Sequence, residues 1–126
     1  MLILSIFETH MQTTIDFSYL EEMAEGKPEF MKQVLSIFMD NTPSGLLLLE
    51  KLVNDGDDME KIQKQAHFLK SSFGIVKVGG MHERLQQMES LAREKKDREQ
   101  IEALMNEITA IFKIAHDMIT EKMEQL

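Results

Sequence analysis

The sequence lacks cysteine and tryptophan entirely, and it has only two prolines and six glycines among its 126 residues. Without cysteine the chain forms no disulfide and no thiolate metal site, which is compatible with a reducing compartment, so we expect a cytoplasmic protein. With so few residues that break helices, and with eleven methionines beside many Leu, Ile, Glu and Lys, the composition favours helix. Regular alternation of apolar and polar residues is scarce, so strands are not expected.

Positive charge is also in short supply. Lys and Arg total 14 against 22 Asp and Glu, which gives a formal net charge of −8. Because no dense basic patch offsets this charge, we expect no binding to nucleic acid. The one strongly apolar run, residues 1–7, lacks a basic flank and is far shorter than the ~20 residues that cross a bilayer. A signal peptide, a membrane span and membrane binding are therefore not expected.

The length suits one domain with a core of its own. We divide the chain into an apolar N-terminal extension, residues 1–14, and a helical domain, residues 15–126. Either Met1 or Met11 could be the natural start, and the sequence leaves both this and the role of residues 1–10 open.

Turn residues divide the first half of the domain into predicted helices. A short helix is predicted over residues 17–24, with Asp16 or Ser18 as its cap. A second helix begins at Pro28 and runs to about residue 41, where Pro43 is expected to interrupt it. A further helix follows from residue 44 and closes at Gly56.

Capping and turn residues also divide the second half of the domain into predicted helices. Asp57, with Glu60 three residues later, resembles a capping box, and it predicts a helix that continues through residue 78 to the glycine pair at 79–80. Another helix is predicted over residues 81–95. Asp97 caps the last and longest helix. The expected fold is all-α: an antiparallel four-helix bundle with an additional short N-terminal helix.

The helix that begins near Asp57 carries one histidine with unusual surroundings. At roughly 100° per residue, its apolar positions form one stripe, and His67 falls on the opposite face. The imidazole should therefore point away from the core. The residues of the predicted core stripe are Ile62, Leu69, Phe73 and Val76.

Small and apolar residues flank the histidine on this helical projection. Ser71 and Gly74 lie one and two turns later on nearly the same line, which would leave room for a docking protein. Phe68 and Ile75 lie beside that line and off the core stripe. They predict an apolar surface for a partner, unless the short first helix covers them.

Lysines surround the same histidine in an otherwise acidic chain. Lys70 and Lys77 project to the other side of it, and Lys64 is within reach. A neutral imidazole is a nucleophile, and nearby ammonium groups stabilise a moving phosphoryl group. No glycine-rich nucleotide loop of the Walker type is present, so ATP is not expected to be the direct phosphoryl donor.

The run after Ala66, HFLKSS, resembles the signature of the histidine-containing phosphotransfer (HPt) domain family, usually written H-x-L-K-G-S-S. The Gly56-Asp57 pair before it and the Met88-Glu89 pair after it are also similar to that family, and the resemblance extends from about residue 15 to the C-terminus. The sequence departs from the family pattern twice. Ser71 stands at the usual glycine, and Lys77 stands where a second glycine is common.

The resemblance implies roles for individual residues. His67 would carry the phosphoryl group, Lys70 would stabilise it, and Glu89 would accept a hydrogen bond from the imidazole. It also implies that receiver domains of response regulators are the partners, including the receiver of a hybrid sensor histidine kinase. The receiver would supply the Mg²⁺ and the acidic pocket, so this chain needs no cofactor or metal site of its own.

The sequence thus predicts a phosphorelay intermediate that takes a phosphoryl group from a receiver phosphoaspartate onto His67 and passes it to another receiver. One alternative is a module that binds receivers and never carries phosphate, and another is the detached C-terminal part of a hybrid sensor kinase. We expect a monomer. The direction of transfer, the cognate receivers, the signal and the output stay open.

Overall fold

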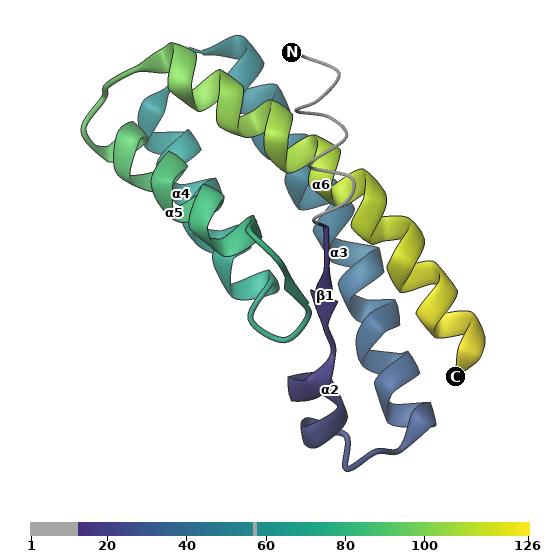
Figure 1. The fold of residues 1–126 in the computed structure, drawn as a ribbon. Helices are drawn as coiled ribbons and strands as arrows, with labels where there is room; N and C mark the ends of the chain where they lie inside the picture. Colours follow the sequence, from purple (N-terminus) through teal and green to yellow (C-terminus); the bar gives the residue numbers. More distant parts are fainter. Residues whose placement is uncertain (1–12, 57) are drawn as a thin grey trace.

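The computed structural model describes residues 13–56 and 58–126, and Figure 1 shows their arrangement. The predicted N-terminal extension lies outside the described residues except for its last two positions, and Asp57 lies outside them as well. The division of the chain into an extension and a domain therefore stays a prediction.

Four antiparallel helices form the body of the molecule: α3 (Pro28–Asp55), α4 (Met59–Ser72), α5 (Met81–Arg93) and α6 (Arg98–Gln125). Each of them packs against its sequence neighbour, and α6 closes the bundle by packing against α3. The short helix α2 (Ser18–Met23) precedes them. The predicted all-α bundle with a short N-terminal helix is confirmed.

The four helices differ in length, and this difference shapes the molecule. The helices α3 and α6 have 28 residues each, whereas α4 has 14 and α5 has 13. At ~1.5 Å per residue, the α4–α5 pair reaches only about halfway along the longer pair. Figure 1 shows α2 and the segment after α4 beside the remaining half.

A two-residue antiparallel pairing joins β1 (Ile15–Asp16) to β2 (Lys77–Val78). The expectation of no strands was wrong at this place, and so was the prediction that the helix of His67 continues to residue 78. The helix ends at Ser72 because the chain beyond it is rich in β-branched residues, which favour extended backbone. Pairing with β1 buries Val78, and Val76 before it has no exposed surface.

Pro43 lies inside α3 and does not interrupt it, contrary to the prediction. The buried stripe of α3 continues in phase on both sides of the proline, because Phe38, Thr42 and Leu46 all face the core. This packing outweighs the hydrogen bond that proline removes. Nearby, the Ser44 hydroxyl donates to the carbonyl of Asn41 at 2.9 Å.

Aspartates cap two of the helices. The Asp97 side chain accepts from the backbone amide of Gln100 at the start of α6, which confirms the predicted cap. At the start of α4 the prediction was one residue early, because the cap is Asp58, which accepts from the amide of Lys61 at 3.1 Å.

The core joins all four helices, and the stripe predicted for the helix of His67 is buried in full. Phe38 on α3, Phe73 just after α4 and Phe112 on α6 meet there, with ring centroids 5.5–6.4 Å apart. Aromatic rings at such distances add to the energy of their burial. Within the part of the chain that the structure describes, no helix is long and apolar enough to cross a membrane.

Truncation of Leu69 should destabilise the bundle strongly. Leu69→Ala removes a side chain with no exposed surface from the α3–α4 contact, so we expect the free energy of unfolding to fall by about 2–5 kcal/mol. Denaturant titration measures this fall. The matched control is Leu47→Ala on α3, where the leucine is 66% exposed and the change should stay within about 0.5 kcal/mol. Equal losses in the two variants would contradict the packing described above.

Candidate functional site

His67 stands on the outer face of α4, and its side chain is 71% exposed. Its neighbours at 66 and 69 on the same helix are buried, so the helix itself holds the imidazole out of the core. The Nδ1 atom lies 2.6 Å from Oε1 of Glu89 on α5. One ring nitrogen is therefore engaged with the protein while the ring remains accessible.

Glu89 is a carboxylate inside the α4–α5 contact, with a side chain only 3% exposed. An ionised carboxylate only accepts hydrogen bonds, so the chemistry of this pair assigns the proton to Nδ1 of His67. The lone pair of the neutral ring then lies on Nε2. This arrangement fixes both the tautomer and the orientation of the imidazole.

Lys70 holds the other side of the same carboxylate. Its Nζ lies 2.8 Å from Oε2 of Glu89 and donates to Oε1 of Gln86 at 2.7 Å. The lysine side chain is 16% exposed. Among the described residues, Oε2 of Glu89 has no hydrogen-bond donor besides this ion-pair partner, so Lys70 provides the charge that compensates this oxygen.

Two opposing effects act on the carboxyl of Glu89. Burial raises its pKa, but the hydrogen bonds from Lys70 and His67 and their charges together outweigh burial. The net result is a pKa below the ordinary value, so Glu89 stays ionised at neutral pH.

A shallow hollow of about 290 Å³ opens beside His67 on the side of the N-terminal end of α4. Gln63 and Lys64 line it from the preceding turn of α4, and Arg93 lines it from α5. The guanidinium of Arg93 reaches Glu89 Oε1 at 3.5 Å and is 56% exposed. Cations therefore approach the imidazole from two helices.

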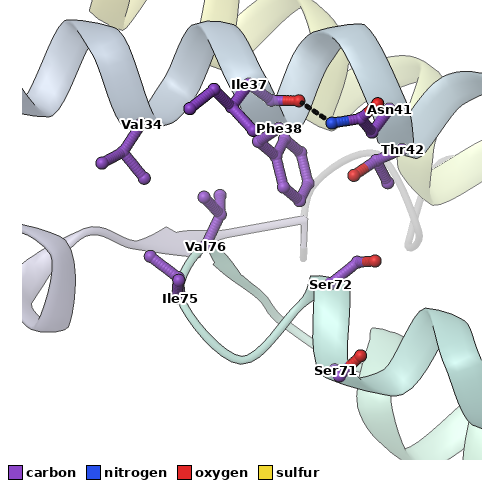
Figure 2. A pocket seen from close by; sticks show the side chains of 9 residues that line it. All are labelled: Val34, Ile37, Phe38, Asn41, Thr42, Ser71, Ser72, Ile75 and Val76. Carbon is purple, nitrogen blue, oxygen red and sulfur yellow. Dashed lines mark hydrogen bonds between the residues drawn. The ribbon is translucent and has the colours of Figure 1, made fainter.

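A second hollow, of about 180 Å³, lies beyond the C-terminal end of α4 and is mostly apolar. Figure 2 shows side chains of α3 on one side of it and, on the other, the end of α4 and the segment that follows. Ile37, at its rim, is 55% exposed. The residues that line it are Val34, Ile37, Phe38, Asn41, Thr42, Ser71, Ser72, Ile75 and Val76.

Three of the residues predicted to bind a partner lie on α4 with His67. Phe68 is 61% exposed, and Ser71, also exposed, donates its hydroxyl to the carbonyl of Phe68 at 2.7 Å. Lys64 is exposed and pairs with Glu60 at 3.1 Å. Since Ser71 also lines the apolar hollow, the surface around His67 continues into it.

The other three predicted residues do not share that face, because α4 ends at Ser72 and the helical projection fails beyond it. Gly74 lies in the turn that follows. Ile75 is half-buried and lines the hollow opposite α3 rather than standing beside Phe68. Lys77 belongs to β2, where its Nζ lies 5.2 Å from the ring centroid of Tyr19. Their roles in partner binding stay predictions.

Sequence reasoning missed Arg93 and Gln86. Both follow from Glu89, since Arg93 lies four residues after it on one helix and Gln86 three residues before it, spacings at which side chains meet. A metal centre was not expected, and among residues 13–56 and 58–126 no three His, Asp or Glu side chains gather to hold a metal ion.

The stability contributed by Glu89 should depend on pH. Because its folded-state pKa is lowered, this contribution is present above the ordinary value of 4.5 and is lost as the pH falls through the lower, folded value. At pH 7, Glu89→Gln leaves Lys70 without its anion and should lower the free energy of unfolding by up to about 3 kcal/mol. The difference in free energy of unfolding between this variant and the unmodified protein, the stability gap, should shrink on acidification to pH 3.

Denaturant titrations at a series of pH values measure this gap. Glu83→Gln is the matched control, because Glu83 is exposed on the same helix and should show little difference at any pH. A gap for Glu89→Gln that stays constant from pH 7 to pH 3 would show that the charge of Glu89 does not stabilise the fold.

Comparison with known families shows the family to which the chain belongs. A family model described as the Hpt domain matches residues 33–125, which is more than half of the chain and includes the whole of α4 and α5. Comparisons with curated proteins and with solved structures give no significant match. The chain therefore belongs to the Hpt domain family, whose members take part in histidine phosphotransfer in phosphorelays and interact with receiver domains.

Proposed function

We propose that His67 accepts a phosphoryl group from the phosphoaspartate of a receiver domain and passes it to a second receiver. The observation that carries this proposal is the contact of an exposed imidazole, through Nδ1 only, with a buried carboxylate at 2.6 Å. Nε2 is left as the nucleophile on the accessible edge of the ring. A histidine with only a structural role would gain little from this combination of exposure and orientation.

The transfer step follows from this geometry. The lone pair of Nε2 forms the new N–P bond, the acyl phosphate P–O bond breaks, and the aspartate carboxylate leaves with the bonding electrons. The ring keeps its Nδ1 proton and becomes positively charged. Glu89, already ionised, stabilises that charge without reorganising, and the reverse step returns the phosphoryl group to an aspartate.

The partner surface of the proposal consists of Phe68, Ser71 and the apolar hollow beside them. An exposed phenylalanine next to the nucleophile offers apolar area to a docking protein, and the hollow accommodates a side chain of that protein. We assign the Mg²⁺ and the acidic pocket to the receiver, and we expect no ATP-dependent kinase activity from this chain.

Substitution of His67 should abolish phosphorylation. After incubation with a phosphorylated cognate receiver and Mg²⁺, the unmodified protein should carry label that is labile to acid and stable to base, and His67→Gln should carry none. His82→Gln is the control, because His82 is an exposed histidine on α5 and its loss should leave labelling unchanged. NMR should place the phosphorus on Nε2. Equal labelling of His67→Gln would end the proposal.

An acidic residue in the partner surface should slow transfer without harming the nucleophile. Ile37→Asp places a charge at the rim of the hollow, and we expect transfer from a receiver at limiting concentration to fall at least about tenfold, because docking loses apolar burial and gains a desolvated charge. The control is Leu47→Asp, an exposed leucine elsewhere on α3. Equal rates in the two variants would remove the hollow from the partner surface.

The same assays separate the alternatives. Receiver binding without label on His67 would favour an interaction module that never carries phosphate. A requirement for covalent linkage to a sensor kinase would favour the detached part of a hybrid protein. The monomeric state expected from the sequence is tested by sedimentation of the purified chain.

A further inference from the structure

The cations around His67 differ in how firmly the protein holds them. Lys70 lies one turn after His67 on α4 and Lys64 one turn before it, while Arg93 approaches from α5. Family resemblance implies that Lys70 stabilises the phosphoryl group on His67. The contacts of the described residues suggest a different division of roles.

Lys70 is held by two short contacts. Its Nζ contacts both Glu89 and Gln86, at 2.8 and 2.7 Å, and its side chain is 16% exposed. If Lys70 turned toward a phosphoryl group on His67, Oε2 of Glu89 would be left buried without a compensating charge, which is costly. The lysine is therefore better suited to keep Glu89 ionised and in place.

Arg93 and Lys64 are held loosely by comparison. Arg93 is 56% exposed and reaches Glu89 only at 3.5 Å, and Lys64 is 74% exposed in a surface pair with Glu60. The Lys64–Glu60 pair is exposed on both sides and contributes little energy, and the Arg93–Glu89 contact is longer than a charge-assisted hydrogen bond, so either side chain reorients at low cost. Both line the hollow that His67 borders, and Lys70 does not. A guanidinium also matches phosphate oxygens with paired hydrogen bonds.

We propose that Arg93, assisted by Lys64, is the residue that contacts the phosphoryl group on His67, and that Lys70 is a positioning residue that acts through Glu89. The inference rests on the proposed function and deepens it. On phosphorylation the guanidinium exchanges its long contact with Glu89 for the phosphoryl oxygens, while the positively charged ring keeps Oε1 of Glu89 paired.

The test uses phosphoramidate, a small donor that removes receiver docking from the measurement. Nε2 of His67 attacks phosphorus, the P–N bond of the donor breaks, and ammonia leaves with a proton from solvent. Three variants of the full chain are compared with the unmodified protein: Arg93→Gln, Lys70→Gln and Lys70→Arg. Arg84→Gln is the matched control, because Arg84 lies on the same helix and pairs with Glu107 instead.

Two measurements distinguish a residue that contacts the phosphoryl group from one that positions the imidazole of His67: the labelling rate with its pH profile, and the ¹⁵N spectrum of the ring. Arg93→Gln should slow labelling about tenfold or more, since a charge-assisted hydrogen bond to the phosphoryl group is lost, and the ¹⁵N spectrum of the unphosphorylated imidazole should not change. Lys70→Gln should change that spectrum, because the tautomer is no longer fixed. It should also move the acidic limb of the labelling–pH profile to higher pH, because the pKa of Glu89 rises when Lys70 no longer lowers it. Lys70→Arg should restore both, and Arg84→Gln should match the unmodified protein.

The opposite pattern overturns the inference. Slow labelling of Lys70→Gln with an unchanged imidazole spectrum and pH profile, together with normal labelling of Arg93→Gln, would return the phosphoryl contact to Lys70. Circular dichroism of each variant shows that a loss of rate is not a loss of fold. Absence of label on the unmodified protein, with this donor and with receivers alike, would instead refute the proposed function itself.

Discussion

The site depends on one buried carboxylate. Glu89 lies between α4 and α5, accepts a hydrogen bond from Nδ1 of His67, and pairs with Lys70, which balances its negative charge. A buried carboxylate is costly unless it is paired, and here the groups that pair it are those that the proposed transfer uses. The same interaction therefore stabilises the contact between two helices, fixes the tautomer of an exposed ring and, in the proposed transfer, would stabilise that ring when it becomes cationic.

The features that sequence could predict are those that depend on local periodicity. The bundle, the buried stripe of α4 and the exposure of His67 follow from the 3.6-residue repeat, and the Asp97 cap follows from side-chain chemistry. Errors arose where tertiary contacts overrode local preference. Pro43 stays within α3 because the core stripe continues past it, and α4 ends early because its following segment pairs with β1.

Within the site, sequence could name residues but not their contacts. The Glu89–His67 pair was suggested by family resemblance alone, since the two residues lie 22 positions apart on different helices. The engagement of Lys70 with Gln86 depends on the rotation of α5 against α4, which no pattern within a single helix specifies. Ile75 and Lys77 were misplaced because a helical projection was applied beyond the end of its helix.

The placement of the site on the α4–α5 pair has a consequence for which parts of this molecule can vary in sequence. His67, Lys70, Glu89 and Arg93 all lie on one helical hairpin, joined by the segment that pairs with β1. Contacts that are close in sequence form with a small loss of chain entropy, so the hairpin can organise this chemistry early in folding. Apart from Ile37 and the other residues of α3 that line the apolar hollow, the outer faces of α3 and α6 are then free to diversify around this hairpin.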